Sequence, residues 1–169
     1  MLVLGIDPGT AICGYGVVAV KNGREKAVDY GAVLTPPEWT MPQRLLHIAE
    51  GLQMLIDRYH PDALAVEELF YQKNAKTVIT VAQARGIILY IGAHNDLEIG
   101  EYTPLQVKQS VVGYGRADKH QVQSMVMQIL HLKEMPKPDD AADALAVALC
   151  HLHTCRMKRI AKIEGNQIL

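Results

Sequence analysis

Residues 2–10 read LVLGIDPGT, a short apolar run that ends at an aspartate and a Pro-Gly pair. Such a run predicts a buried β-strand that is stopped by turn-forming residues. The segment 14–20 is rich in valine, and Asn22-Gly23 separates it from a second apolar segment, residues 27–34. Because Asn-Gly between two apolar segments is typical of a β-hairpin, we expect the chain to open with three antiparallel strands.

The rest of the chain alternates between helical and strand patterns. Apolar residues between Met41 and Tyr59 recur every three or four positions, which predicts a long amphipathic helix. Because strands separated by helices pair in parallel, we expect an α/β fold: a mixed five-stranded sheet with helices on both faces. The other expected elements are strands over 63–66 and 97–102, the latter broken by Pro104, and helices over 76–94, 118–130 and 139–157.

The composition favours one folded domain. The chain has 169 residues, is 49% hydrophobic and carries a formal net charge of −1. No apolar run approaches the roughly 18 residues that cross a bilayer, and no secretory signal is evident, so no membrane association is expected. The cysteines are odd in number and lack metal-ligand spacing, which favours reduced thiols in a cytoplasmic protein. They are Cys13, Cys150 and Cys155.

Charged residues are segregated along the chain, although their sum is close to zero. Residues 69–95 contain no acid, and residues 102–133 contain Asp118 as their single acid. Such segments could form a basic face for a polyanion or an ordinary solvated surface, and charge alone favours the ordinary surface. The basic residues of the two segments are Lys73, Lys76, Arg85, Lys108, Arg116, Lys119 and Lys133.

Acidic residues gather where two predicted strands end and the last helix begins. Asp7 follows the first strand, and Glu67-Glu68 follows the fourth. Asp140 and Asp143 are three residues apart and therefore share one face of the last helix. An isolated buried carboxylate is costly, whereas several can be held together by a divalent cation.

The pattern leaves two choices open. Asp139 and Asp143 are four residues apart and could share a helix face equally well. Glu67 and Glu68 are neighbours on a strand and point to opposite faces, so the pattern does not say which one joins the cluster. Without a cluster, Asp139 and Asp140 would simply interact favourably with the dipole at a helix N-terminus.

Carboxylates without a cysteine or histidine partner favour a hard ion, Mg²⁺ or Mn²⁺. Two such ions can activate water and stabilise the departing oxygen in phosphodiester cleavage. A rival interpretation rests on Gly5-x-Asp7-x-Gly9-Thr10, which could contact a nucleotide phosphate through Mg²⁺, as in actin-like ATPases and sugar kinases. That function would need a second, similar motif in a duplicated domain, and the chain is too short to contain one.

Further motifs follow in order between residues 2 and 153. The opening GIDPGT (5–10) is followed by GYGV (14–17), VEELF (66–70) and AQARG (82–86). Tyr102-x-Pro104-x-x-Val107-Lys108, VVGYGRADK (111–119) and DAADALA (140–146) complete the set. Taken together, these motifs resemble the RuvC family of Holliday junction resolvases.

The resemblance implies an RNase H-like fold and a homodimer that nicks two opposing strands of a four-way DNA junction during recombination and repair. It implies Mg²⁺ as cofactor, with Mn²⁺ as a substitute and two ions per site, and the RuvA–RuvB branch-migration complex as a partner. It places the nuclease domain at 1–157 and leaves the tail, 158–169, unassigned. By motif position, the metal-binding catalytic carboxylates would be Asp7, Glu67, Asp140 and Asp143.

The resemblance also implies DNA contacts. Lys108 and Lys119 resemble basic residues that contact phosphate, and Phe70 resembles an aromatic residue that stacks on junction bases. It selects Glu67 over Glu68 and makes Asp139 an extra acid. A nuclease acting on RNA, or a protein of the same fold that binds without cutting, remains the second hypothesis. Further expected DNA contacts are Lys73, Lys76, Arg85 and Arg116.

Overall fold

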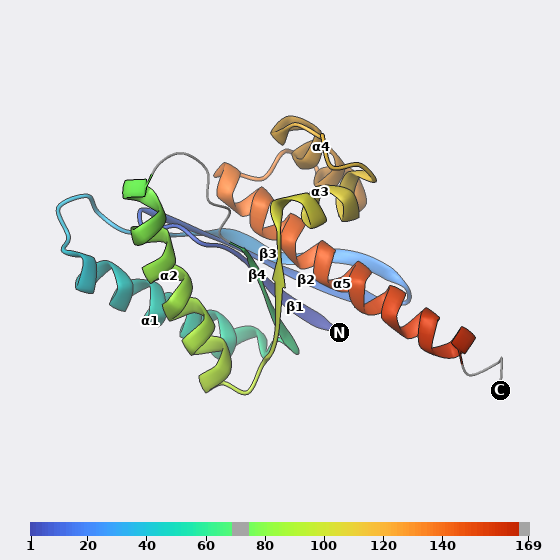
Figure 1. Cartoon of the computed structure of the whole chain (residues 1–169), viewed down its shortest axis with the longest axis horizontal. Coiled ribbons are helices and arrows are strands. Elements are labelled where there is room, and N and C mark those ends of the chain that lie inside the picture. The colour runs from blue at the N-terminus through green and yellow to red at the C-terminus, as the bar shows by residue number, and fades with distance from the viewer. Residues whose placement is uncertain (69–74, 166–169) are drawn as a thin grey trace.

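The computed structural model describes residues 1–68 and 75–165, which form a five-stranded mixed sheet with helices on both faces (Figure 1). The strands lie in the order β3-β2-β1-β4-β5. They span Leu2–Asp7 (β1), Ile12–Lys21 (β2), Arg24–Leu34 (β3), Ala63–Glu67 (β4) and Glu98–Tyr102 (β5). The helices span Met41–Tyr59 (α1), Ala75–His94 (α2), Pro104–Val112 (α3), Lys119–Ile129 (α4) and Asp139–Gly165 (α5). No helix within the described ranges is long and apolar enough to cross a membrane.

The first three strands form the predicted antiparallel meander. β2 pairs antiparallel with both β1 and β3. The turn between β2 and β3 holds Asn22 and Gly23 with φ angles of 53° and 75°. Positive φ at both central residues matches the right-handed twist of the flanking strands, and Asn-Gly adopts it at little cost. The hairpin therefore follows directly from these two residues.

The later strands extend the sheet in parallel, as predicted. β4 pairs parallel with β1, and β5 pairs parallel with β4. Each parallel step is bridged by a helix, α1 before β4 and α2 before β5. Because parallel strands end at the same edge of a sheet, the carboxyl ends of β1 and β4 lie side by side.

Each face of the sheet has its own hydrophobic core. On one face, Leu4 and Ile6 of β1 pack with the buried residues of α1 and α2. On the other face, Val3 packs with α5, and α3 and α4 lie beyond it (Figure 1). The alternation along β1 follows from the period of two in a strand, and both sides of this central strand are buried.

Glycines in the sheet let α5 approach closely. A methyl group on Gly5 would lie 2.8 Å from the Cβ of Ala148, and one on Gly16 would lie 2.8 Å from the side chain of Leu145. Both distances are shorter than real carbon contacts, so these strand positions admit no larger residue without moving the helix. The facing side of α5 is correspondingly rich in buried alanine. The strand glycines thus fix the height of α5 above the sheet.

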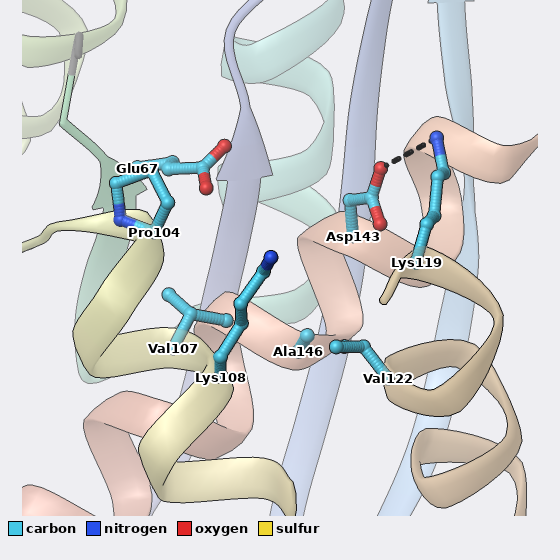
Figure 2. Close-up of a pocket in the computed structure, with 8 residues that line it drawn as sticks. All are labelled: Glu67, Pro104, Val107, Lys108, Lys119, Val122, Asp143 and Ala146. Atoms are coloured by element: carbon cyan, nitrogen blue, oxygen red, sulfur yellow. Dashed lines mark ion pairs between the residues drawn. The ribbon is translucent and has the colours of Figure 1, made fainter. Parts of the chain in front are cut away.

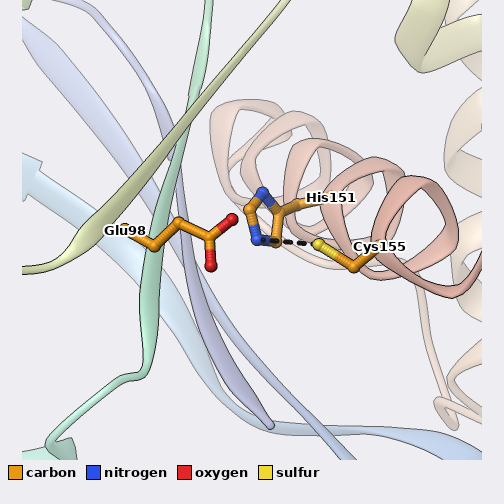
Figure 3. A group of neighbouring side chains, drawn as sticks. All are labelled: Glu98, His151 and Cys155. Carbon is orange, nitrogen blue, oxygen red and sulfur yellow. Dashed lines mark hydrogen bonds between the residues drawn. The ribbon is translucent and has the colours of Figure 1, made fainter. Parts of the chain in front are cut away.

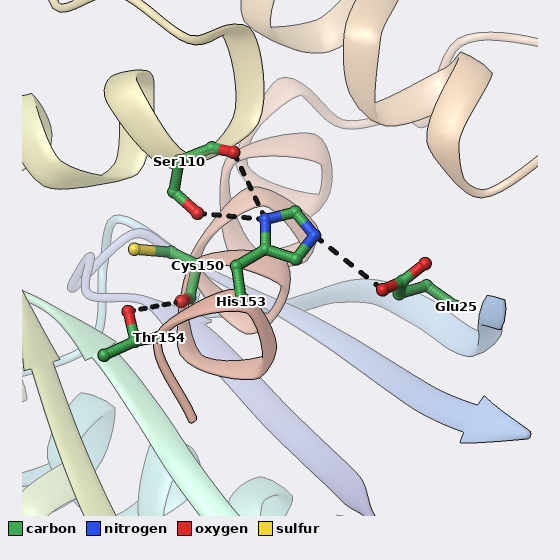
Figure 4. Close-up of polar contacts among 5 residues, drawn as sticks. All are labelled: Glu25, Ser110, Cys150, His153 and Thr154. Atoms are coloured by element: carbon green, nitrogen blue, oxygen red, sulfur yellow. Dashed lines mark hydrogen bonds and ion pairs between the residues drawn. The ribbon is translucent and has the colours of Figure 1, made fainter. Parts of the chain in front are cut away.

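Polar contacts join α5 to α3 and to β3 (Figure 4). The Oγ of Ser110 lies 3.0 Å from the Nδ1 of His153, whose Nε2 lies 3.8 Å from a carboxylate oxygen of Glu25. One residue further along α5, the hydroxyl of Thr154 donates to the carbonyl of Cys150 at 2.8 Å. The contact between Ser110 and His153 ties α3, the helix that carries Lys108, to α5.

Two features differ from the sequence-based expectation. The helix α3 was not predicted, because Pro104 was taken as the end of a strand. Pro104 is instead the first residue of the helix, and Thr103 caps it by accepting a hydrogen bond from the Gln106 N–H. Proline suits this position because the first helical N–H has no partner within the helix. In addition, α5 continues to Gly165, beyond the expected end near Met157.

Candidate active site

Two acidic residues stand side by side at the carboxyl ends of neighbouring strands. Ile6 of β1 pairs with Val66 of β4, and the next residues, Asp7 and Glu67, are the last of their strands. On its other side, Asp7 pairs with Gly14 of β2. The parallel register therefore places both carboxylates at one edge of the sheet.

The first turns of α5 bring the remaining acids to the same edge. A methyl group on Gly14 would collide with the carbonyl of Asp140 and lie 2.9 Å from its Cβ. Since Gly14 is the strand partner of Asp7, the start of α5 lies directly beside the end of β1. Asp143 follows one turn later on the same helix face. The predicted set of four acids thus gathers from β1, β4 and α5.

The electrostatics of these acids reflect burial and crowding. Burial, followed by the charges of Glu67, Asp143 and Asp140, raises the pKa of Asp7 to about 8. Burial and then the charge of Asp143 raise the pKa of Glu67 to about 7, against the opposing effect of Lys108 and Lys119. Burial also raises the pKa of Asp143. Near neutral pH, these carboxyl groups would give up their protons more readily if a cation neutralised them.

Lysines supply positive charge beside the acids. The Nζ of Lys119, at the start of α4, lies 3.0 Å from Asp143 and 3.5 Å from Asp139. Burial lowers the pKa of Lys119, whereas the hydrogen bond and the attraction to Asp143 raise it, with a smaller contribution from Asp139. The net result is a raised pKa. Lys119 begins α4 directly after Asp118, which caps the helix by accepting from the Gln121 N–H.

A pocket of about 200 Å³ opens between these groups (Figure 2). Glu67 lies on one side, Asp143 and Lys119 on the other, and Lys108 points from α3 into the space between them (Figure 2). Two lysines and two carboxylates therefore stand among the residues that line the pocket. Its lining consists of Glu67, Pro104, Val107, Lys108, Lys119, Val122, Asp143 and Ala146.

The donor set suits a hard divalent cation. The predicted ligands are all carboxylates, and Mg²⁺ and Mn²⁺ prefer oxygen donors. Among the described residues, no three of these carboxylates place oxygens within 4.8 Å of one another. A bound cation would draw these oxygens together. The close grouping of Asp7, Glu67 and Asp143 at one edge of the sheet supports the fit, and it also contributes to the raised pKa values of Asp7 and Glu67.

Other predicted DNA contacts have varied surroundings. Arg85 of α2 forms an ion pair with Glu101 of β5. Arg116 is exposed in the connection between α3 and α4. Lys76 belongs to the first turn of α2, but its side chain lies outside the described residues. Phe70 and Lys73 also lie outside the described residues.

Sequence reasoning missed some contributors to this region and left one open. Gly14 was noted within a motif, but its role in seating Asp140 depends on the close approach of α5. A glycine in a strand interior is the available signal, because it often marks the approach of another backbone. Pro104 and Val107 line the pocket from α3, the helix that was not predicted. Asp139, left open between a cap and a ligand, contacts Lys119.

The comparisons with known proteins agree with these observations. The family model of the crossover junction endodeoxyribonuclease RuvC matches residues 3–151. The crossover junction endodeoxyribonuclease RuvC of Syntrophomonas wolfei is 60% identical over 99% of this chain and 97% of that protein. The protein of the same name from Clostridioides difficile is 54% identical over 99% of each chain.

Solved structures give the same picture. Thermus thermophilus RuvC in complex with a Holliday junction substrate is 38% identical, with a TM-score of 0.88 over 94% of this chain and 96% of that one. The yeast mitochondrial Holliday junction resolvase Ydc2 shares the fold at 13% identity, with a TM-score of 0.73 over 99% of this chain and 84% of that one. The fold is therefore the expected RNase H-like one, and the chain belongs to the RuvC family of crossover junction endodeoxyribonucleases.

Proposed function

We propose that this protein resolves four-way DNA junctions by metal-dependent nicking of two opposing strands, in recombination and DNA repair. Membership of the RuvC family makes the chain a crossover junction endodeoxyribonuclease and a metal-dependent nuclease. The observation that carries the proposal is the gathering of Asp7, Glu67 and Asp143 at one end of the sheet, where Glu67 and Asp143 line a pocket together with Lys108 and Lys119.

Asp7, Glu67, Asp140 and Asp143 are the residues that would hold Mg²⁺, with Mn²⁺ as a substitute and two ions per site. When bound, such ions activate a water molecule and stabilise the oxygen that leaves the phosphorus. The fold positions these ligands from two sides. Asp7 and Glu67 are held at the ends of paired strands, and α5 brings Asp140 and Asp143 from above the sheet. Rigid elements position such ligands more precisely than loops do.

Lys108 and Lys119 would contact the backbone phosphates of the strand that is cut. Both lysines line the pocket beside the acids, and each lowers the pKa of Glu67 through its charge. A lysine is a flexible point charge, so it can follow a phosphate that enters beside the metal site. Phe70, Arg85 and Arg116 remain candidates for DNA contacts because they lie in RuvC-like motifs. Lys73 and Lys76 remain candidates because they belong to the acid-free basic segment 69–95.

Nicking two opposing strands in a coordinated way calls for two active sites. A homodimer with a twofold axis provides them, because each copy presents the same pocket to symmetry-related strands. The RuvA–RuvB branch-migration complex is the proposed partner that delivers the junction. Both assignments follow from the family, and the monomer described here supplies one site of the pair.

The substrate class is tested by comparing three labelled nucleic acids. A synthetic four-way junction, a linear duplex of the same sequence and an RNA–DNA hybrid are incubated with the purified protein in Mg²⁺ or in EDTA. We expect paired nicks in the junction with Mg²⁺ and none with EDTA, with the duplex left intact. Preferential cutting of the hybrid would instead favour the second candidate, a nuclease that acts on RNA.

A further inference from the structure

A second group of metal-ligating side chains lies away from the acidic pocket. Glu98 begins β5, and His151 and Cys155 lie on α5 (Figure 3). One ligand atom from each side chain lies within 4.8 Å of those of the other two. His151 follows Asp143 by eight residues, which is roughly 12 Å along a helix. The acidic pocket and this group are therefore separate places on the same helix.

The imidazole of His151 is held from both sides. Its side chain is 1% exposed, the Nδ1 lies 3.0 Å from the hydroxyl of Tyr102, and the Nε2 lies 3.4 Å from the Sγ of Cys155. Histidines that bind metals usually donate their other ring N–H to an outer partner, which fixes the tautomer. The hydroxyl oxygen of Tyr102 can accept a hydrogen bond from the Nδ1–H of His151. In that tautomer Nε2 carries no proton, and its lone pair is directed toward Cys155.

The backbone of β5 is adapted to this ring. A methyl group on Gly100 would collide with the Nδ1 of His151 and would lie 2.9 Å from the hydroxyl of Tyr102. The glycine thus leaves the space that the imidazole occupies, and β5 limits the positions that the ring can take. Glu98, two residues earlier on the same strand, directs its carboxylate toward the ring and is exposed to solvent (Figure 3).

We propose that Glu98, His151 and Cys155 bind one Zn²⁺ ion, with water as a fourth ligand. Thiolate, imidazole and carboxylate are the three donor types that zinc accepts, and zinc commonly takes four ligands at the corners of a tetrahedron. Zinc–ligand distances of about 2.0–2.3 Å place the donor atoms roughly 3.3–3.8 Å apart. The thiol and imidazole already stand at 3.4 Å, and the exposed Glu98 can close the remaining distance by a side-chain rotation.

The protonation states are compatible with this assignment. Burial lowers the pKa of His151, which favours the neutral ring that a metal requires. Burial and the charge of Glu98 raise the pKa of the Cys155 thiol, so the ion must displace a proton from sulfur as it binds. The choice of Zn²⁺ over Mg²⁺ follows from the sulfur and nitrogen donors, which Mg²⁺ does not favour.

A metal ion here would join α5 to the edge strand of the sheet. His151 and Cys155 lie on the part of the helix beyond its alanine-rich half, whereas Glu98 lies on the outermost strand, β5. An ion that binds all three residues in the folded chain and not in the unfolded chain stabilises the folded state. The ion would therefore act on the stability of the fold, and its binding does not depend on the proposed nuclease chemistry.

Cobalt provides a direct test, because a Co²⁺ ion bound by a thiolate has a charge-transfer absorption that carboxylate-bound Co²⁺ lacks. The full-length, zinc-free protein is titrated with Co²⁺ in excess Mg²⁺, which keeps the acidic pocket filled. We expect a thiolate band that saturates at one ion per chain and disappears when Zn²⁺ is added. Zn²⁺ should also raise the thermal unfolding midpoint of the parent protein.

Substitutions of single residues identify the side chains that bind the ion and cause the absorption band. Cys155→Ser should abolish the band and the thermal shift, whereas the matched control Cys150→Ser, on the same helix, should keep both. Glu98→Gln should weaken Zn²⁺ binding by more than the roughly 10–100-fold that loss of an outer-shell partner costs. Absence of a thiolate band in the parent protein would overturn the proposal, as would a band that survives Cys155→Ser. Junction cleavage by Cys155→Ser in Mg²⁺ should equal that of the parent, which separates this test from the proposed function.

Discussion

The ammonium group of Lys119 lies 3.0 Å from the carboxylate of Asp143, so a lysine at the start of α4 is in direct contact with an acid of α5. A second acid, Asp139, lies 3.5 Å from the same nitrogen. Lys119 thereby offsets part of the negative charge that gathers at this edge of the sheet. A scissile phosphate that enters the pocket would meet Lys119 and Lys108 beside the acids.

Replacement of either lysine by alanine should weaken junction binding, cleavage or both. A phosphate contact releases counterions, so each replacement should reduce the slope of log affinity against log salt by about one unit. Binding titrations from low to moderate salt measure this slope. Lys21→Ala, at the exposed tip of the hairpin, is the matched control and should keep the parent slope.

Phe70→Ala gives a contrast within the same titration. A residue that stacks on bases should lose affinity while the salt slope stays unchanged, because stacking releases no counterions. If Lys119→Ala kept the slope, the affinity and the cleavage rate of the parent, its phosphate role would have to be abandoned.

Glu67 and Glu68 should behave differently although they are neighbours. Glu67 lines the pocket, whereas the backbone N–H of Glu68 donates to the carbonyl of Tyr102 beyond the end of β4. Glu67→Gln should reduce cleavage by orders of magnitude, because removal of a metal ligand weakens water activation. Glu68→Gln should cost little. The nicking rates of the two variants test this difference. The reverse result would mean that the motif assignment is shifted by one residue.

The stability of the metal-free protein should depend on the pH through Asp7. Its pKa lies at about 8 in the folded chain, against 3.8 ordinarily, so above pH 4 the folded state holds a proton that the unfolded state has released. The folded state therefore loses stability as the pH rises from about 4 to about 8. In EDTA, Asp7→Asn should unfold at a higher temperature than the parent at pH 8, with a smaller difference near pH 4.

Thermal unfolding with and without Mg²⁺ completes this test. Mg²⁺ should reduce the loss of stability in the parent at pH 8, because the cation favours the ionised carboxylates. Glu68→Gln serves as the control and should follow the parent curve. Parallel curves for the parent and Asp7→Asn across the whole pH range would argue against a crowded, buried carboxyl at this position.

Gly14→Ala should damage the site without touching any acid. The added methyl group would collide with the backbone of Asp140 and force the start of α5 away from β2. Overpacking of this kind costs about 1–3 kcal/mol, and displacement of Asp140 should lower the cleavage rate as well. Gly86→Ala is the control, since a methyl group there meets no atom of the described residues within 4 Å. A variant with parent stability and activity would show that α5 can shift freely.

The sequence predicted the parts of the fold that depend on local chemistry. Asn22-Gly23 determined the hairpin, and the spacing of apolar residues after Met41 determined α1. The helix at Pro104 was missed because proline ends one element and begins another equally well, and only the cap at Thr103 distinguishes the two outcomes. Local propensity therefore sufficed for isolated elements and failed at a junction between them.

The candidate site, like the fold, was predictable only in part. That Asp7 would lie beside an acid of the Glu67-Glu68 pair was predictable, because parallel strands end together. The choice of Glu67 came from the RuvC resemblance, and the comparisons confirm the family. The role of Gly14 depends on the distance between a helix and a sheet, which no local pattern encodes. The approach of Glu98 to His151 was equally hidden, since the two residues are far apart in sequence and meet only because α5 packs against β5.

Cleavage of a labelled four-way junction by the parent and by Asp7→Asn, in Mg²⁺, tests the central claim most directly. An amide occupies the space of the carboxylate but is a poor metal ligand. We predict that Asp7→Asn binds the junction with an affinity close to that of the parent and produces no detectable nicks. A variant that nicks the junction at a rate within a few-fold of the parent would contradict the assignment of Asp7, and with it the account of the acidic pocket as the nuclease centre.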